Sequence, residues 1–237
     1  MKNALVIMAK APLPGEAKTR LATLLSPEDA AELSHCFFLD VVELAQSVSG
    51  CEVVVAYAPE DALEIFSVES LKVAKCISQG RGDLGQRMKR VFETMFDSGY
   101  AKVVLIGTDL PTIRLSSLQE AFSSLKNHPV ILGPSLDGGY YLLGMQDMIP
   151  EIFEGIDWGT DRVLGQTFER LSEKNIRSER LPAWYDVDKP EELNFLIAHL
   201  ELLKCCTDEH LPQHTMGFLE REGLLPKRSS ESQSNDG

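Results

Sequence analysis

The chain has 237 residues, of which 43% are hydrophobic, and its formal net charge is -13. This length suits one large α/β domain or two small ones. The acidic balance argues against general nucleic-acid binding, which needs a broad basic face. The longest apolar runs are too short to cross a bilayer, and five scattered cysteines without a C-x-x-C pair are typical of reduced thiols. We therefore expect a cytoplasmic protein with no membrane span that acts on small molecules.

The N-terminal segment combines a strand with a cationic loop. The apolar run Ala4–Met8 predicts a strand buried on both faces. The charged residues among the first twenty are cationic with one exception, a balance of +3: Lys2, Lys10, Lys18, Arg20 and Glu16. After such a strand, backbone N–H groups and cationic side chains can converge on phosphates. We interpret residues 9–21 as an anion-binding loop; the alternative is an exposed turn with incidental lysines.

Strands and helices alternate along the rest of the chain. Ser26 as N-cap and Pro27 at the first helical position predict the start of a long helix. Further helices are predicted at residues 61–66, 84–96, 115–126, 161–174 and 190–203. Further strands are predicted at residues 52–58, 72–77, 102–107, 129–133, 140–144 and 180–187. This alternation predicts an α/β fold with a three-layer, doubly wound and mostly parallel sheet, in which the pair 129–133 and 140–144 can pack antiparallel.

The same pattern predicts the domain organisation. No linker, repeat or second hydrophobic core interrupts residues 1–225, so one domain is expected there. Residues 226–237 are polar and contain no aromatic residue, which predicts a disordered tail. Ligands of such a fold bind at the carboxyl ends of the strands, and each of the motifs below directly follows a predicted strand.

A glycine-rich segment follows the third predicted strand. Gly80, Gly82 and Gly85 form a G-x-G-x-x-G pattern that opens a helix. At the first strand this pattern would indicate a dinucleotide-binding oxidoreductase, but here the first strand is followed by the cationic loop. We interpret the segment, including Asp83, as a second wall of a nucleotide pocket. The alternative is a tight turn in which Asp83 caps the helix.

Acidic residues that follow two later strands are candidate metal ligands. Asp109 precedes the next predicted helix by several residues, so helix capping explains it poorly, whereas Mg²⁺ takes one or two protein carboxylates together with phosphate oxygens. Asp186 and Asp188 end the last predicted strand, where residues two apart face the same side. A cation would join these two acids, with Asp188 the preferred ligand. The alternative is that Asp188 caps the following helix and Asp186 is solvated.

A turn separates the strands predicted at 129–133 and 140–144. It contains Asp137, Gly138 and Gly139. Asp-Gly-Gly between two apolar runs is typical of a plain hairpin turn. The functional alternative is that Asp137 and the glycine amides line the pocket for a sugar or another acceptor.

As an ordered set, these motifs resemble the nucleotide-diphospho-sugar transferase superfamily, which has the glycosyltransferase-A fold. More narrowly, the chain resembles the bacterial glycosyltransferase-A-like, or radical-SAM/selenium-domain-associated, transferases. The resemblance extends from about Lys2 to Leu203. It rests on residues 8–12 with Gly15 and 18–21, and on residues 79–85, 107–111, 137–141 and 186–188.

The resemblance implies a Mg²⁺- or Mn²⁺-dependent transferase with a nucleotide-activated donor. Its main implication is glycosyl transfer from a nucleotide-diphospho-sugar to a small-molecule acceptor. The alternative is nucleotidyl transfer from an NTP with release of pyrophosphate, because residues 17–21 and 25–28 also resemble phospholactate guanylyltransferases. In addition, Gly107-Thr108-Asp109 lacks the Asp-x-Asp motif of the glycosyltransferases. A second alternative is a nucleotide-binding protein without turnover.

The expected roles follow from the same motifs. The expected catalytic residues are Lys18, Arg20 and Asp109. The expected nucleotide-binding residues are Ala9, Lys10, Gly15, Lys18, Gly80, Gly82 and Asp83. The expected acceptor-binding residues are Asp137, Gly138 and Gly139, and the expected metal ligands are Asp109 and Asp188. These roles require the cationic loop and Asp109 to meet around one phosphate chain.

Overall fold

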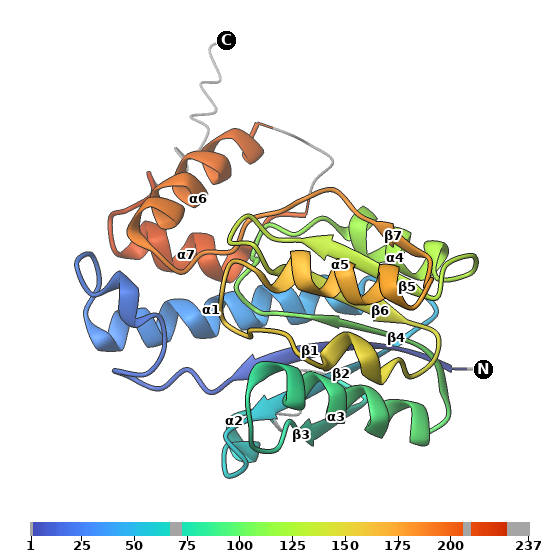
Figure 1. The fold of residues 1–237 in the computed structure, drawn as a ribbon. Helices are drawn as coiled ribbons and strands as arrows, with labels where there is room; N and C mark the ends of the chain where they lie inside the picture. Colours follow the sequence, from blue (N-terminus) through green and yellow to red (C-terminus); the bar gives the residue numbers. More distant parts are fainter. Residues whose placement is uncertain (1, 67–72, 206–209, 227–237) are drawn as a thin grey trace.

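The computed structural model describes residues 2–66, 73–205 and 210–226. Within these ranges seven strands form one sheet in the order β3-β2-β1-β4-β6-β5-β7 (Figure 1). The strands are β1 (Lys2–Lys10), β2 (Glu52–Ala58), β3 (Lys75–Ser78), β4 (Tyr100–Ile106), β5 (Val130–Pro134), β6 (Tyr140–Met145) and β7 (Ser178–Arg180). Strand β6 runs antiparallel to β4 and β5, and the other neighbouring pairs are parallel. The prediction of a mostly parallel α/β sheet is therefore confirmed.

Helices cover both faces of this sheet and complete three layers. One face packs against α1 (Pro27–Gln46), α2 (Leu63–Phe66) and α4 (Leu115–Ser124). The other face packs against α3 (Leu84–Asp97), α5 (Val163–Glu173) and the 3-10 helix η3 (Pro150–Phe153). Successive residues of β1 alternate between the two cores: Leu5 lies in the first and Val6 in the second, and neither is exposed. This two-sided burial explains why β1 is a continuous apolar run.

A third cluster of buried residues joins the two ends of the chain. It unites the 3-10 helix η1 (Thr19–Leu21) and α1 with α6 (Pro190–Leu203) and α7 (Gln213–Arg221). Leu21, Phe37, Leu196 and Phe218 are all buried in it, and Figure 1 shows α6 and α7 beside α1. The cluster also includes Val187, and it therefore holds the loop after β1 against the segment that leads into α6.

Local sequence signals account for some helix boundaries but not for all. The Ser26 side chain accepts a hydrogen bond from the Asp29 N–H at 3.1 Å, and Pro27 occupies the first helical position of α1, as predicted. Helix α7 was not predicted. Its first turn is capped by Asp40 of α1, whose carboxylate accepts the N–H groups of His214 at 2.9 Å and Thr215 at 2.8 Å. A cap supplied by a distant residue leaves no local sequence signal.

The strand predicted at 180–187 is wrong over most of its length. Strand β7 ends at Arg180, and the following residues bond the sheet only intermittently, through the N–H groups of Leu181 and Trp184. Leu181 and Val187 are buried, so the segment has the apolar pattern of a strand without a continuous ladder. Asp186 and Asp188 are consequently free to point in different directions.

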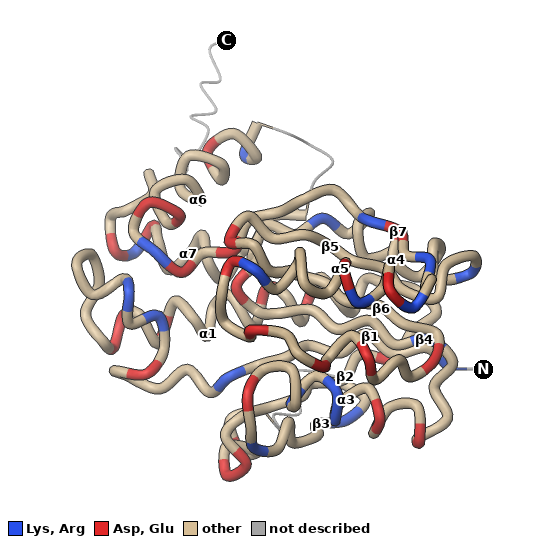
Figure 2. The backbone as a smooth tube through the Cα atoms, viewed as in Figure 1, with Lys and Arg blue, Asp and Glu red and all other residues tan. Residues whose placement is uncertain are grey.

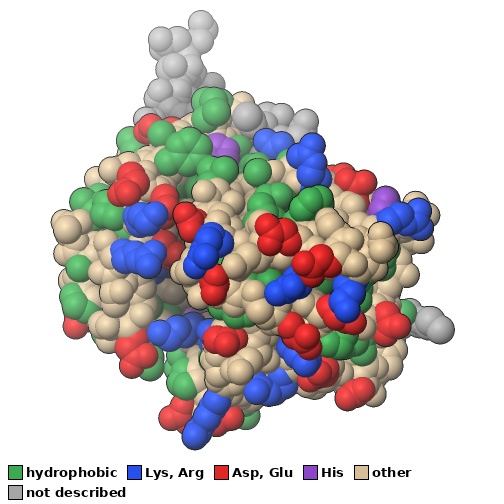
Figure 3. Space-filling model, in the orientation of Figure 1, with side chains coloured by type: hydrophobic (Ala, Val, Ile, Leu, Met, Phe, Trp, Pro, Cys, Tyr) green, Lys and Arg blue, Asp and Glu red, His purple; other side chains and the backbone are tan. Residues whose placement is uncertain are grey.

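Other expectations concern the ends and surface of the molecule. The predicted tail 226–237 lies outside the described residues apart from Pro226, and the single domain at 1–225 stays a prediction. In the part of the chain that the structure describes, no helix has both the length and the apolar character needed to cross a membrane. Basic and acidic residues are interspersed along the backbone in Figure 2 and over the face shown in Figure 3.

Candidate functional site

A cleft of about 560 Å³ lies beside the carboxyl ends of the first three strands of the chain. It brings Lys10 of the cationic loop together with Gly80 and Gly82 of the glycine-rich segment, as the pocket interpretation requires. The other residues that line it are Glu16, Ala58, Pro59, Glu60, Asp61, Arg81 and Arg87. The wall formed by residues 58–61 was missed, although it follows β2 and the rule of strand ends pointed to it.

The buried side chain of Gln79 organises the inner wall of this cleft. Its amide nitrogen donates to the carbonyl oxygens of Ala9 at 3.0 Å and Ala56 at 2.7 Å, and so ties the segment to β1 and β2. Its amide oxygen accepts a hydrogen bond from Arg87 Nη1 at 3.2 Å. Gln79 therefore positions the Arg87 guanidinium at the cleft. Gln79 was not predicted, because a single polar residue after a strand is an ordinary turn residue in sequence.

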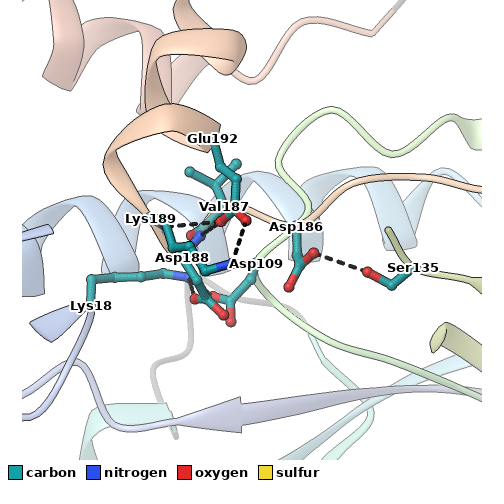
Figure 4. Close-up of polar contacts among 8 residues, drawn as sticks. All are labelled: Lys18, Asp109, Ser135, Asp186, Val187, Asp188, Lys189 and Glu192. Carbon is teal, nitrogen blue, oxygen red and sulfur yellow. Dashed lines mark hydrogen bonds and ion pairs between the residues drawn. The ribbon is translucent and has the colours of Figure 1, made fainter. Parts of the chain in front are cut away.

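Lys18 of the cationic loop meets Asp109 and Asp188, and we call these three residues the carboxylate–lysine triad (Figure 4). The Lys18 Nζ atom lies 2.5 Å from Asp109 Oδ1 and 2.7 Å from Asp188 Oδ1. It also donates to the carbonyl oxygen of Val187 at 2.6 Å. A backbone hydrogen bond from the Val187 N–H to the Asp109 carbonyl, at 3.0 Å, fixes the two acidic segments side by side. The structure thus brings the cationic loop and the two predicted metal ligands together.

Burial and charge act in opposite directions on the ionisation of this triad. Burial tends to lower the pKa of Lys18, but the charges of Asp109 and Asp188 outweigh it, and its pKa is raised. Burial raises the pKa of Asp109, helped by the charge of Asp188 and opposed by Lys18. Lys18 is therefore an ammonium ion that neutralises one of two neighbouring carboxylates. An excess negative charge remains, and it attracts cations.

Asp186 lies apart from the triad. Its Oδ1 accepts a hydrogen bond from Ser135 Oγ at 2.9 Å, and Figure 4 shows the side chain directed away from Asp109 and Asp188. The expectation that Asp186 and Asp188 face the same side is wrong, because the segment is not a strand. Burial raises the pKa of Asp186, and the charge of Asp137 adds to this effect.

Glu192 of α6 orients Asp188 and was missed in the sequence. Its Oε2 accepts the backbone N–H groups of Asp188 at 2.7 Å and Lys189 at 2.8 Å. The signal that could have identified it is a glutamate in the first turn of a helix that begins with Pro190, where acids commonly satisfy the free N–H groups. The N-cap of α6 is Lys189, so the alternative that Asp188 caps this helix is wrong.

The turn between β5 and β6 has the geometry of the hairpin alternative. Asp137 is exposed, and its Oδ1 accepts the N–H of Gly139 at 2.9 Å. Gly138 has a φ of +90°, and its carbonyl oxygen accepts the N–H of Leu164 at 2.9 Å. These contacts explain the Asp-Gly-Gly sequence by local folding. The role of Asp137, Gly138 and Gly139 in acceptor binding stays a prediction.

The remaining residues with a predicted catalytic or nucleotide-binding role lie in different surroundings. Ala9 is fully buried, its carbonyl accepts a hydrogen bond from Gln79, and it is not among the residues that line the cleft, so its role in nucleotide binding stays a prediction. Asp83 is the N-cap of α3 and accepts the N–H of Gln86 at 2.8 Å, which is the capping alternative. Gly15 borders a smaller hollow of about 90 Å³ together with Lys18. Arg20 is exposed in η1.

A second group of metal-ligand type lies between α1 and α7. Asp40, Glu43 and His214 present ligand atoms within 4.8 Å of one another, and they are the one such trio found among the described residues. Both Asp40 oxygens already accept hydrogen bonds, from the N–H of His214 and from the N–H and hydroxyl of Thr215. This group therefore has a structural explanation as the cap of α7.

Comparison with known proteins identifies the family. A family model described as "Uncharacterized protein conserved in bacteria (DUF2064)" matches residues 41–160, slightly more than half of the chain. The chain belongs to the DUF2064 family. The match begins within α1 and ends just before α5, so it includes the glycine-rich segment, Asp109 and the β5–β6 turn but not Lys18 or Asp188.

Relatives of this DUF2064 protein are transferases. The 2-phospho-L-lactate guanylyltransferase of Methanocaldococcus jannaschii is 26% identical over 199 residues, which cover 82% of each chain. A crystal structure from Desulfovibrio desulfuricans G20, provisionally named a nucleotide-diphospho-sugar transferase, is 30% identical, with a TM-score of 0.83 and coverage of 94% of this chain and 97% of that one. A nucleotidyl transferase from a Methanothermobacter species shares the fold, with a TM-score of 0.61 at 14% identity over 84% of this chain and 97% of that one.

These similarities bear on the fold and on the type of reaction. The chain is a transferase with the fold of the nucleotide-diphospho-sugar transferases. The curated relatives are named for nucleotidyl transfer, so the comparisons favour that alternative over glycosyl transfer. The narrower association with radical-SAM and selenium domains stays a prediction.

Proposed function

We propose that this DUF2064 protein is a metal-dependent nucleotidyltransferase, which transfers a nucleoside monophosphate from an NTP to a small acceptor and releases pyrophosphate. The observation that carries the proposal is that the cationic loop brings Lys18 to Asp109 and Asp188 and also lines a cleft together with the glycine-rich segment. Phosphoryl chemistry depends on positioning and on stabilisation of charge, and this arrangement supplies groups for both.

The donor set suits a hard divalent cation. Asp109 and Asp188 offer carboxylate oxygens from two adjacent segments, and their side chains are 40% and 38% exposed, whereas the Lys18 side chain is buried. Oxygen ligands of this type are preferred by Mg²⁺ and Mn²⁺. These two residues would hold the ion, whose contribution would be to neutralise charge on the phosphate oxygens.

The cleft supplies the contacts that a nucleotide needs. Lys10 and Arg87 line it with cationic groups, and Gln79 holds the arginine in position. Gly80 and Gly82 have φ values of +70° and +113°, so their backbone bends where a base or ribose would approach. We assign nucleotide binding to this cleft, with the triad at its phosphate end and Arg20 at the outer edge of the loop.

The acceptor side is assigned to the β5–β6 turn and the segment before α6. Asp137 and Asp186 lie close enough for their charges to interact, and Ser135 holds Asp186 in place. The curated relatives are named for 2-phospho-L-lactate, which makes small hydroxy acids and their phosphates the first acceptors to test. Glycosyl transfer is the second candidate, supported by the name of the Desulfovibrio structure.

The proposal is tested by measuring pyrophosphate. The purified protein is incubated with Mg²⁺, each of the four NTPs and a panel of small hydroxy acids and phosphorylated acceptors. Nucleotidyl transfer predicts that pyrophosphate appears in proportion to a nucleotidylated acceptor. Transfer of sugar from a nucleotide-diphospho-sugar, with no pyrophosphate from any NTP, would establish the second candidate instead. If the protein binds nucleotide but forms no product from NTPs or from nucleotide-diphospho-sugars, it is a nucleotide-binding protein without turnover.

A further inference from the structure

The Lys18 ammonium has no hydrogen-bond donor left for a ligand. An ammonium carries three N–H groups, and Lys18 has three acceptors: Asp109 Oδ1, Asp188 Oδ1 and the Val187 carbonyl. Its side chain is only 3% exposed. In this structure the Lys18 ammonium is therefore directed at the two carboxylates, and its expected catalytic role stays a prediction.

The surrounding fold holds Lys18 in this position. Its backbone has a φ of +49°, which is uncommon for a residue with a side chain. The ammonium lies 5.4 Å from the ring centroid of Phe37, a fully buried residue of α1. The loop conformation and the aromatic contact both direct the ammonium toward the two carboxylates. Such strained positions are maintained only when several contacts determine them together.

The same carboxylates are the proposed ligands of the divalent cation, so two cations would share them. Lys18 already occupies one oxygen of each acid, and its positive charge repels a second cation at this short range. A nucleotide triphosphate changes this balance, because its phosphate oxygens are alternative acceptors for the ammonium and additional ligands for the metal.

We propose that Lys18 is an internal counterion that occupies Asp109 and Asp188 until a nucleotide arrives, so that the divalent cation and the nucleotide bind cooperatively. Lys18 is a positioning residue in this state: it keeps the carboxylates together and disfavours metal binding in the absence of nucleotide. The inference rests on the proposed function, since it takes Asp109 and Asp188 as the metal ligands. By linkage, each ligand then strengthens the binding of the other.

The test compares Mn²⁺ binding without nucleotide in three full-length proteins, by electron paramagnetic resonance of the free ion. They are the wild type, Lys18→Met and the matched control Lys174→Met, which removes an exposed lysine at the end of α5. Removal of the competing charge should tighten Mn²⁺ binding by Lys18→Met about tenfold or more, whereas Lys174→Met should match the wild type. Equal or weaker Mn²⁺ binding by Lys18→Met would overturn the inference.

A second measurement uses only the wild type, so it holds even if Lys18→Met does not fold. With lysine labelled at Nζ, the protected Lys18 ammonium should give a distinct NMR resonance. Mg²⁺ alone should leave this resonance in place, and Mg²⁺ with the α,β-methylene analogue of GTP should shift it. A shift caused by Mg²⁺ alone, or no shift with the analogue bound, would contradict the counterion role.

Asp109→Asn separates this inference from the proposed function. If Asp109→Asn binds Mn²⁺ as well as the wild type does, Asp109 is not a metal ligand, and the metal assignment of the proposed function fails with the inference. If Asp109→Asn loses Mn²⁺ binding and Lys18→Met does not gain it, the metal assignment stands and only the counterion role is refuted.

Discussion

Three distant parts of the chain contribute Lys18, Asp109 and Asp188, and Lys18 forms an ion pair with each of the two acids. Two carboxylates in contact would repel each other in a partly buried site, and one of them would take up a proton unless a cation joined them. The ammonium at 2.5 and 2.7 Å supplies that cation here. The ammonium therefore explains why these acids can lie together, and by the proposal above a divalent ion binds them once a nucleotide is present.

Replacement of Asp109 by Asn should abolish most of the activity. The amide keeps the shape of the side chain but removes the negative charge that the metal and Lys18 require. We expect kcat/KM for pyrophosphate release to fall about 100-fold or more. The matched control is Asp97→Asn at the exposed end of α3, which should stay within about threefold of the wild type. Full activity of Asp109→Asn would show that the carboxylate is not part of the site.

The thiols of Cys36 and Cys51 should react slowly at moderately alkaline pH. Burial raises the pKa of each to about 11. Because only the thiolate is nucleophilic and an ordinary cysteine has a pKa near 8.5, alkylation by iodoacetamide at about pH 8 should be on the order of 100-fold slower than for free cysteine. The rate should rise roughly tenfold per pH unit up to about pH 10. Rapid labelling of either residue at neutral pH, mapped by mass spectrometry, would contradict this assignment.

At the scale of elements, helix α3 and its glycine-rich approach position one wall of the cleft. Asp83 caps the helix, Gln79 anchors the segment to β1 and β2, and Arg90 Nη1 donates to the Gln79 carbonyl at 2.5 Å. Gly80 and Gly82 line the cleft, whereas Gly85 is required for packing. A Cβ atom there would lie 2.1 Å from Cε2 of Trp158, so the last glycine of the pattern admits an aromatic ring.

Two glycines in helices should therefore respond oppositely to alanine. Gly85→Ala forces a clash with Trp158 and should lower the free energy of unfolding by about 1–3 kcal/mol. Gly165→Ala in α5 places its Cβ in open space and should raise it by up to about 1 kcal/mol, because alanine favours the helix. Urea unfolding gives both values, and tryptophan fluorescence should change for Gly85→Ala alone. Equal stability of the two variants would show that Gly85 is not limited by packing.

Element boundaries show where sequence reasoning succeeds. Ser26 and Pro27 begin α1 as predicted, because a cap and a first-turn proline act within a few residues. The segment after Arg180 was predicted as strand because Leu181 and Val187 are apolar, but burial alone does not supply a hydrogen-bonding partner. Helix α7 was missed because its cap, Asp40, is remote in sequence.

At the scale of the whole molecule, the parallel order of β1, β2, β3 and β4 gathers their loops at one edge. This topology made the site predictable in part: a residue at the end of a strand or just after it was expected at that edge, which holds for Lys10, Gly80 and Asp109. The partners of each side chain were not predictable. Sequence does not show that Lys18 would saturate its donors within the protein, or that Asp186 would turn to Ser135.

The central claim is that the cationic loop, Asp109 and Asp188 meet around one phosphate chain. A crystal structure with Mn²⁺ and the α,β-methylene analogue of GTP tests it most directly. The account predicts a Mn²⁺ ion bonded to Asp109, Asp188 and phosphate oxygens, with the nucleotide in the cleft between residues 58–61 and 80–82. Binding of the ion at Asp40, Glu43 and His214, or of the nucleotide on a surface remote from Lys18, would contradict it.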